Sequence, residues 1–355
     1  MNSNRLIQTF VNMVRINSES SNESEFADFM MKTGNILGTK SWKDAYGNVY
    51  LFVDGKGDGI MLNTHMDTVS PGNGINPRVH GEYITSDGST ILGADSKAGI
   101  AAMVEVLTIL KESGRTHRPV LITLSCNEEV GIPTAQHIVS DIKLCVVPDR
   151  GTPVGEIITE APYAQVYEVA IHGEAVYAPT HYKHGKHAIM AAVEMIKALP
   201  LGDIDEYTTT NIGIITGGRM TSMVPEDCVF KGNCYSFSKE SFERFLTTLD
   251  ETVDRVNERY GTTAQVRMLE YFGGYKIDRA DPLVKLVDTA MRNVQIDPVY
   301  QVYKAVTNAN LLNDAGIKSV LISTGVENQH TVNERVSIRS LEQITQILQE
   351  IVTMT

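Results

Sequence analysis

The sequence predicts an α/β fold, a mixed sheet flanked by helices, with a smaller α+β domain inserted into the chain. Strand-like apolar runs alternate with helical stretches in residues 1–161 and again in residues 274–355, a pattern typical of a sheet covered by helices. Residues 162–273 instead follow the order β-α-β-β-α-β, which is that of a small two-layer domain. A chain of 355 residues also exceeds the size at which one hydrophobic core usually stops growing, so we expect two domains.

The composition excludes several classes of partner. The formal charge is -12 and no run rich in lysine or arginine is present, so neither nucleic acid nor an anionic membrane is expected as a partner. No apolar stretch approaches the roughly 20 residues that span a bilayer, and the polar first residues lack a signal peptide's apolar core. We therefore expect a cytoplasmic protein. The four cysteines contain no C-x-x-C pair, which favours buried free thiols over disulfides or a zinc cluster.

The first elements are two helices, expected at residues 4–14 and 24–37 from apolar positions at helical spacing. Strands are expected at 48–53 and 59–62, and the glycine-rich segment between them has the composition of a hairpin turn. This segment lacks the Lys-Ser/Thr ending of a phosphate-binding loop and precedes a strand, which argues against nucleotide binding there.

The first candidate site residues come directly after the strand at 59–62. His65 and Asp67 are two residues apart, so on extended backbone their side chains share a face. An imidazole that binds a metal through one nitrogen usually donates its other N–H to a carboxylate. The pair therefore predicts a metal ligand, His65, oriented by Asp67. The alternative is a loop histidine beside a turn or capping aspartate.

Further carboxylates stand where the next expected elements begin or end. Asp95 lies at the entrance of a strongly apolar helix, where it could also be an N-cap. Glu128 and Glu129 follow a buried strand at 119–126, and Asp149 closes the next one. Adjacent carboxylates in such a place are costly unless a positive charge offsets them, although an exposed acidic turn is the alternative. Because ligands gather at the carboxyl ends of strands in α/β sheets, these side chains could converge on one edge.

The inserted domain is expected to be a ferredoxin-like α+β unit. Its elements are strands at 163–172, 209–216, 224–236 and 263–271 and helices at 184–199 and 239–260. After it we expect helices at 282–292, 308–314 and 340–352, a short strand near Tyr300 and a strand at 319–323. His330 follows the last of these strands, which predicts a second imidazole at the same edge of the sheet.

Together these residues form a donor set suited to a divalent ion such as zinc, which accepts nitrogen and oxygen ligands. A carboxylate that bridges two ions ~3.5–4 Å apart would let them activate water and polarise a carbonyl. One glutamate would remain as the general base. The chemistry predicted is metal-assisted hydrolysis of an amide.

The motifs His65-Met66-Asp67, Gly93-Ala94-Asp95-Ser96-Lys97 and Glu128-Glu129, followed by Asp149 and His330, resemble those of the co-catalytic zinc exopeptidases and deacylases. That family includes peptidase T, the desuccinylases, carboxypeptidase G and the aminoacylases. The peptidase T-like branch is the most similar, and the resemblance covers essentially the whole chain. One departure within these motifs is Ser96, where a second aspartate is more usual.

The resemblance implies a role for each of these residues. One zinc ion would be held by His65, Asp95 and Asp149, and a second by Asp95, Glu129 and His330. Manganese or cobalt are alternatives to zinc. Glu128 would be the catalytic base and Asp67 the partner of the first histidine. The inserted domain would act as a lid and form a homodimer.

Four further positions depart from the family pattern, and these four concern contacts with the substrate. Tyr177 stands in place of the family histidine that stabilises the developing oxyanion, and Ser222 in place of an asparagine. Tyr235 falls near the arginine that pairs with the substrate carboxylate, and Asn308 lies in an altered loop near the second half of the site. A tyrosine cannot replace a bidentate arginine.

The hypothesis is therefore a dinuclear zinc hydrolase of small peptides or N-acyl amino acids with an altered substrate pocket. One alternative is an orthodox aminotripeptidase in which Arg219 or a nearby residue binds the carboxylate. Another is a metal-binding protein that has lost turnover and serves as a binding or regulatory subunit. The position of Tyr177 favours this last alternative.

Overall fold

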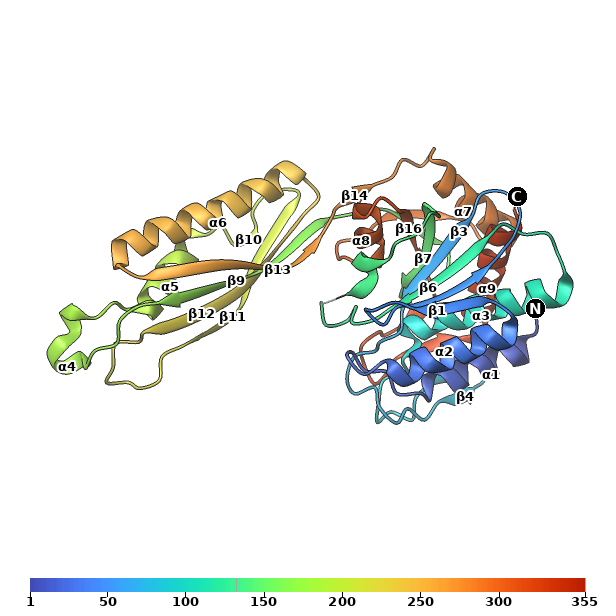
Figure 1. Ribbon diagram of the computed structural model, residues 1–355, viewed down its shortest axis with the longest axis horizontal. Coiled ribbons are helices and arrows are strands. Elements are labelled where there is room, and N and C mark those ends of the chain that lie inside the picture. Colours follow the sequence, from blue (N-terminus) through green and yellow to red (C-terminus); the bar gives the residue numbers. More distant parts are fainter. Residues whose placement is uncertain (132, 355) are drawn as a thin grey trace. The chain divides into compact units, whose positions relative to one another are not determined.

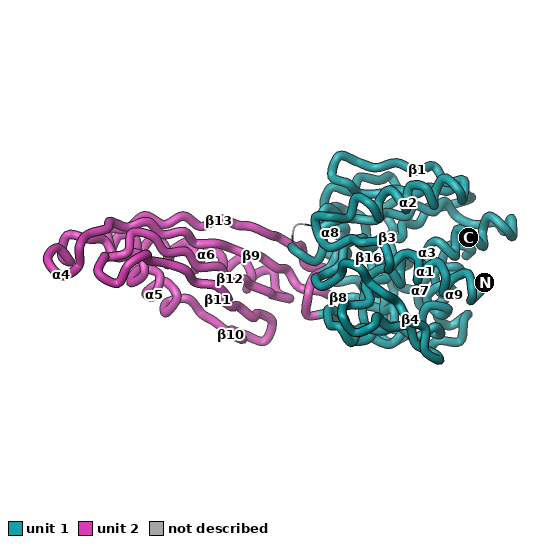
Figure 2. The backbone as a smooth tube through the Cα atoms, turned by 90° about the horizontal axis from the view of Figure 1, so that it is seen from below, with its two compact units in different colours: residues 1–160, 276–303, 307–355 teal, residues 161–275, 304–306 magenta. Residues whose placement is uncertain are grey.

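The computed structural model describes residues 1–131 and 133–354. The chain divides into two compact units (Figure 2). The first unit comprises Met1–Glu160, Lys276–Tyr303 and Thr307–Thr355, and the second comprises Ala161–Tyr275 and Lys304–Val306.

The first unit contains a mixed sheet of nine strands, counted over the described residues. Its order is β1-β2-β6-β3-β7-β16-β8-β14, with β15 paired to β8. The strands are β1 (Lys40–Lys43), β2 (Val49–Val53), β3 (Ile60–His65), β6 (Val120–Ser125), β7 (Leu144–Arg150), β8 (Glu156–Ala161), β14 (Tyr275–Lys276), β15 (Val299–Val302) and β16 (Lys318–Ser323). The four central strands β6, β3, β7 and β16 are parallel, while β1, β2 and β8 join antiparallel.

The expected hairpin between the strands at 48–53 and 59–62 was wrong. β2 and β3 do not pair, because β6 lies between them and pairs with both. Every residue of β3 is buried, and a strand buried on both faces belongs in the interior of a parallel sheet. The glycine-rich segment is therefore a connection that passes the start of β6, where the N–H of Lys56 donates to the carbonyl of His117 at 2.8 Å, rather than a tight turn.

Helices flank this sheet (Figure 1). They are α1 (Ser3–Val14), α2 (Ser24–Leu37), α3 (Ala94–Ser113), α7 (Pro282–Asn293), α8 (Asn308–Asp314) and α9 (Ile338–Thr353), with a 3-10 turn at Thr134–His137. α3 packs against α1, α9 and strands β3 and β7, whereas α8 packs against β16 and β3. A small second sheet has the order β17-β18-β5-β4, formed by Val326–Glu327, Arg335–Ser337, Tyr83–Thr85 and Arg78–His80. The arrangement confirms the predicted α/β fold with a mixed sheet flanked by helices.

The second unit is an antiparallel sheet with helices packed against it (Figure 1). Its strands are β9 (Tyr163–His172), β10 (Gly202–Asp203), β11 (Thr208–Gly217), β12 (Asp227–Ser236) and β13 (Thr263–Phe272), in the order β10-β11-β12-β9-β13. Its helices are α4 (Ala178–His181), α5 (Ala188–Ala198) and α6 (Lys239–Tyr260), with a 3-10 turn at Tyr182–His184. Without the short β10, this is the ferredoxin-like order expected from the sequence.

One helix boundary in the second unit differs from the prediction. The helix expected from His184 begins at Ala188, because the ring of His187 accepts the backbone N–H of Met190 at 3.2 Å and caps the helix there. Among the described helices, none is both long and apolar enough to cross a membrane.

Candidate metal centre

The central parallel strands bring the candidate ligands to one edge of the sheet. β3 lies between β6 and β7 and runs parallel to both, so the three strands end at the same edge. His65 is the last residue of β3, Glu128 and Glu129 follow β6 after a short turn, and Asp149 lies at the end of β7. From the sequence, these side chains are expected to converge because parallel strands end at one edge of the sheet.

Asp95 reaches the same place from the start of α3, and it does not cap the helix. Asp95 and Ser96 depart from helical geometry, so the regular helix begins after them, and the side-chain oxygens of Asp95 contact His65, Gln329 and His330 instead of the N–H groups of the helix. The carboxylate of Glu334 accepts the backbone N–H groups of Gly93 at 2.6 Å and of Asp95 at 2.9 Å. This contact fixes the backbone while the side chain of Asp95 points to the two histidines.

The two oxygens of Asp95 face different histidines. Oδ1 lies 3.4 Å from Nε2 of His65, and Oδ2 lies 3.1 Å from Nε2 of His330. Asp149 completes the first group, with Oδ1 3.3 Å from Nε2 of His65. Glu129 completes the second, with Oε1 3.0 Å from Nε2 of His330. The result is two three-residue groups that share one carboxylate.

The orientation of His65 is set from the side away from Asp95. Its Nδ1 lies 2.9 Å from the backbone carbonyl of Asp67 and 3.4 Å from the Oδ1 atom of that residue. Since a carbonyl only accepts, Nδ1 is the donor, and Nε2 is the ring nitrogen that faces Asp95 and Asp149. Nε2 could bind an ion once it has lost its proton. The nearer partner is thus the main chain of Asp67, although the sequence pointed to its carboxylate.

The carboxylate of Asp67 holds the glutamate pair instead. Its Oδ1 accepts the backbone N–H of Glu128 and its Oδ2 that of Glu129, both at 3.1 Å. The hydroxyl of Ser20 adds a third hydrogen bond at 2.7 Å. Next to it, Oε1 of Glu23 accepts the backbone N–H of Asn127 at 3.0 Å. Three successive N–H groups of the loop are therefore held by two carboxylates.

Glu23 and Ser20 were missed by the sequence reasoning. Both stand in the turn before α2, with Glu23 at its N-cap position. Glu23 is 104 positions from Asn127, whose N–H it accepts, and Ser20 is 47 positions from Asp67. The motif Ser20-Ser21-Asn22-Glu23 has the composition of a helix start, and this local role gives no sign of the long-range contact.

Contacts between imidazoles and carboxylates set the charges of the centre. Burial alone would lower the pKa of His65, but the charge of Asp149 and the contacts with Asp67 and Asp95 raise it well above its usual value. The pKa of His330 is raised to about 10, first by Asp95 and next by Glu129. Two imidazolium protons thus offset the carboxylates, and a divalent ion would have to displace them, since ligating imidazoles are neutral.

The donor set fits divalent ions. In the groups His65, Asp95, Asp149 and Asp95, Glu129, His330, the ligand atoms lie within 4.8 Å of one another. Oε1 of Glu129 is buried, and its contact in the described chain is the ion pair with Nε2 of His330 at 3.0 Å. It accepts no regular hydrogen bond from the described residues, so it can turn a lone pair to a cation. Glu128 and Glu129 also form a group with His65 by the same measure. Imidazole nitrogens with carboxylate oxygens and no thiolate suit a catalytic rather than a structural zinc site.

Of the four residues predicted to contact substrate, Asn308 lies beside this centre. It is the first residue of α8 and fully buried, and its Nδ2 donates to Oγ of Ser125 at 2.8 Å. Ser125 is the register partner of His65. The Oδ1 atom of Asn308 is buried without a hydrogen-bond partner in the described part of the chain.

The other three predicted substrate residues belong to the second unit and lie at two places in it. Tyr177 and Ser222 are neighbours, since Ala178 donates its N–H to the carbonyl of Ser222 at 2.9 Å. Tyr235 lies near the far end of β12, where it pairs with Ala164. Tyr235 is eight positions from Asp227, which begins β12 at its end near Tyr177, and this corresponds to roughly 26 Å of strand. Within this unit, the three side chains do not meet.

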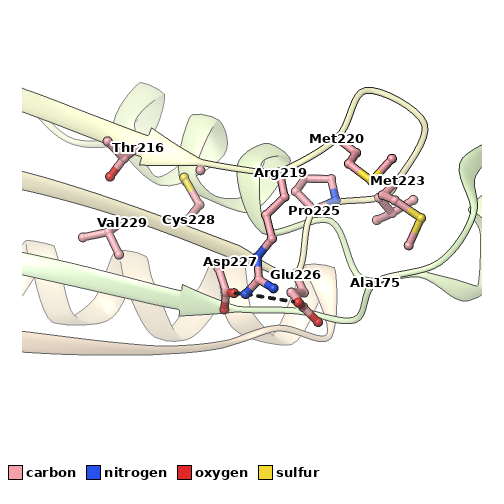
Figure 3. Close-up of a pocket in the computed structure, with 13 residues that line it drawn as sticks. Ala175, Thr216, Arg219, Met220, Met223, Pro225, Glu226, Asp227, Cys228 and Val229 are labelled. Carbon is pink, nitrogen blue, oxygen red and sulfur yellow. Dashed lines mark hydrogen bonds and ion pairs between the residues drawn. The ribbon is translucent and has the colours of Figure 1, made fainter.

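A cavity of about 410 Å³ lies beside Ser222 in the second unit, lined mainly by apolar side chains that include Met220, Met223 and Pro225. Arg219 extends along it toward two carboxylates (Figure 3). The guanidinium lies 3.2 Å from Asp227 and 3.5 Å from Glu226. This arginine is therefore already neutralised by its own unit.

The sequence and structure were compared with known proteins. The model of peptidase family M20/M25/M40 matches residues 61–354. The chain is 31% identical to the uncharacterized protein YqjE of Bacillus subtilis over 99% of both chains. It is 29% identical to peptidase T of Streptococcus thermophilus, over 76% of this chain and 67% of that protein. Two solved structures are similar over 99% of this chain and 98% of their own: the aminopeptidase PepT of Bacillus cereus, with TM-score 0.87, and a tripeptidase of Staphylococcus aureus, with TM-score 0.91. Each is 30% identical to the chain.

Proposed function

Because the chain belongs to peptidase family M20/M25/M40, we propose that it is a dinuclear metal-dependent hydrolase of amide bonds in small peptides or N-acyl amino acids. Membership in this family, together with its similarity to peptidase T, makes the chain a peptidase T-like hydrolase that acts on peptide bonds. Our proposal adds to this the number of metal ions, their identity as zinc, and the class of substrate.

The observation that carries the proposal is the position of Asp95. One of its oxygens lies with His65 and Asp149, and the other lies with His330 and Glu129. A carboxylate placed between two imidazoles in this way is suited to bridge two ions. Two ions bound there would supply the positive charge that polarises a carbonyl and makes water more acidic.

The protein's own groups would then complete the reaction. Glu128 lies half-buried beside the same cluster and is not needed in either of the two groups that contain Asp95. We assign its carboxylate the proton transfer from the attacking water to the leaving nitrogen. The carboxylate of Asp67 keeps Glu128 in place, because it accepts the backbone N–H of Glu128. The lone Oδ1 atom of Asn308 is assigned a hydrogen bond to substrate or to a water molecule at the centre.

The homodimer predicted from the sequence is part of the proposal, with the second unit as its interface. Tyr177 and Ser222 lie far along the sheet from Tyr235, so one copy of this unit cannot bring all three to one substrate. In a dimer, a second copy of the unit could supply Tyr177 and Ser222 to a substrate that contacts Tyr235 of the first copy. A cytoplasmic location is also proposed, in keeping with four buried free thiols.

An orthodox aminotripeptidase is the second candidate, favoured by the 30% identity with the Staphylococcus aureus tripeptidase. Turnover of a panel of tripeptides and N-acetyl amino acids separates the two candidates. Strict preference for tripeptides with a free amino end would support the second candidate over the first.

Metal analysis and one variant test the proposal itself. We expect purified protein, after incubation with Zn²⁺, Mn²⁺ or Co²⁺, to retain two ions per chain. Glu128→Gln should keep both ions and lose activity by roughly a hundredfold or more. A protein that retains no divalent ion, or a variant as active as the wild type, would refute it. A protein that holds two ions but hydrolyses nothing in the panel would instead support a binding role.

A further inference from the structure

Arg150 ends β7 directly after Asp149, and its charge has no partner in the described chain. No hydrogen bond or ion pair connects its guanidinium to residues 1–131 or 133–354, and its Nε atom is buried without an acceptor. A buried N–H of a charged group that lacks an acceptor is costly. A partly buried arginine of this kind is suited to a negatively charged group that the chain does not itself provide.

The side chain is nevertheless held in place. Its Cζ atom lies 4.3 Å from the ring centroid of Tyr303, a stacking contact that leaves the N–H groups free at the edge of the guanidinium plane. The backbone is fixed as well, since the carbonyl of Arg150 accepts the N–H groups of Thr324 at 2.7 Å and Thr152 at 3.0 Å. The guanidinium is thus preorganised for a bidentate ligand.

Contacts connect this arginine to the metal centre. In the chain, Arg150 directly follows Asp149 and directly precedes Gly151. Gln329 packs against Gly151 so closely that an added Cβ would lie 2.0 Å from its side chain. The same glutamine donates its Nε2 to Oδ2 of Asp95 at 2.6 Å. Burial is the main cause of the raised pKa of Tyr303; the charge of Arg150 lowers this pKa, and the charges of Asp149 and Asp95 raise it further. The stacked pair is therefore within electrostatic reach of the centre.

The other candidate arginine is less suited to this task. Arg219 is 78% exposed and already paired with Glu226 and Asp227 (Figure 3). A substrate carboxylate would have to displace those two groups. At a centre rich in carboxylates, a negatively charged substrate also needs a cation that is not already neutralised, and Arg150 meets that condition.

We propose that Arg150, held against Tyr303, binds the carboxylate of the substrate, so that the preferred substrates are amides with a free carboxylate near the scissile bond. This inference rests on the proposed function, since it names the substrate class of the same centre. It makes Arg150 a residue that determines specificity, with Tyr303 as its positioning residue.

The test compares matched pairs of substrates. Each tripeptide or N-acetyl amino acid in the panel is measured beside its carboxamide, with protein reconstituted with Zn²⁺ or Mn²⁺. For Arg150→Met, we expect kcat/KM for the acids to fall roughly tenfold to a hundredfold, mostly through KM, while the carboxamides change little. Arg150→Lys should lie between, because a lysine cannot make the bidentate contact. Tyr303→Ala should lower activity on the acids in the same selective way.

Arg279→Met is the matched control, because Arg279 also stacks on a tyrosine, with Cζ 4.5 Å from the ring of Tyr300. It should leave both members of each pair unchanged. Three results would overturn the inference: no preference of the wild type for acids, an equal loss on acids and carboxamides in Arg150→Met, or an acid-selective loss in Arg219→Met alone.

A separate arm keeps the inference testable if no substrate is turned over. Binding of trialanine and its carboxamide is then measured by titration calorimetry with the wild type and Arg150→Met. Absence of turnover contradicts the proposed function. Tighter binding of the acid that disappears in the variant supports the role of Arg150, and equal binding of both peptides contradicts it.

Discussion

Asp67 accepts the backbone N–H of Glu129 through Oδ2 at 3.1 Å, so a residue beside the first histidine also fixes a ligand proposed for the second ion. The other oxygen of Asp67 accepts the N–H of Glu128 at 3.1 Å. Its main-chain carbonyl meanwhile holds Nδ1 of His65. One aspartate therefore aligns a ligand of each proposed ion and the proposed base.

Asp67→Asn should reduce activity strongly, although asparagine has nearly the same size and shape as aspartate. An amide has one accepting oxygen, so one of the two loop N–H groups would face an NH₂ group and lose its acceptor. We expect kcat to fall roughly tenfold to a hundredfold and the free energy of unfolding to fall by about 1–3 kcal/mol. Steady-state kinetics and denaturant unfolding measure the two effects.

Ser20→Ala is the control for this change, because it removes one hydrogen bond to Asp67 and leaves both loop contacts in place. Its effect on kcat should be clearly smaller. An equal loss of kcat in both variants would show that the hydrogen bonds from Asp67 to the loop N–H groups do not account for the loss of activity.

Asp95→Asn should disturb both proposed ion sites at once. An amide offers one ligand oxygen and no negative charge, so we expect the metal content to fall from two ions per chain to one or none. Asp297→Asn changes an exposed aspartate and should leave the content at two. Inductively coupled plasma mass spectrometry after dialysis gives the count. Retention of two tightly bound ions in Asp95→Asn would argue against a bridging role.

Removal of metal should lower the melting temperature of the first unit. An ion that binds only the folded state at a hundred times its Kd stabilises it by about 2.7 kcal/mol, which corresponds to a rise of roughly 5–10 °C for a domain of this size. We expect dialysis against a chelator to lower the transition and Zn²⁺ or Mn²⁺ to restore it, measured by calorimetry. The shift should be largely absent in Asp95→Asn, and a full shift in that variant would place the stabilising ions elsewhere.

The sequence predicted much of this centre because its residues stand at the ends of elements. His65, Asp149 and the glutamate pair each follow an apolar run that could only be a buried strand, and parallel strands bring such residues to one edge. The hairpin was predicted wrongly for the opposite reason. A glycine-rich segment such as 54–59 has the same composition in a turn as in a longer connection, and only the later strand β6 decides between them.

Contacts between distant loops could not be predicted in this way. Glu23 and Asn127 are 104 positions apart, and nothing in the local pattern of either residue indicates the other. The stacking of Arg150 on Tyr303 is of the same kind, since it joins the end of one strand to a residue after another. The roles of Tyr177, Ser222, Tyr235 and Asn308 in substrate binding remain predictions.

Glu23→Gln tests whether the loop needs a charge or only an acceptor. Burial is the main cause of the raised pKa of Glu23, with a smaller contribution from the nearby Asp67. Because the pKa is higher in the folded chain than in the unfolded chain, the folded state binds more protons between the two values. The wild type should therefore lose stability relative to Glu23→Gln as the pH rises from about 4.5, the usual pKa of a glutamate, to neutrality.

The glutamine can keep both main-chain contacts, since the N–H groups of Ser21 and Asn127 are accepted by the same oxygen, Oε1. We expect Glu23→Gln to equal the wild type in acid, to be at least as stable at pH 7.5, and to keep its activity within a fewfold. Glu25→Gln, an exposed change in the same helix, should show no such pH-dependent difference. Unfolding by urea at a series of pH values measures the difference in the free energy of unfolding between each variant and the wild type. A variant less stable than the wild type at neutral pH would show that the carboxylate charge itself holds the loop that carries Glu128 and Glu129.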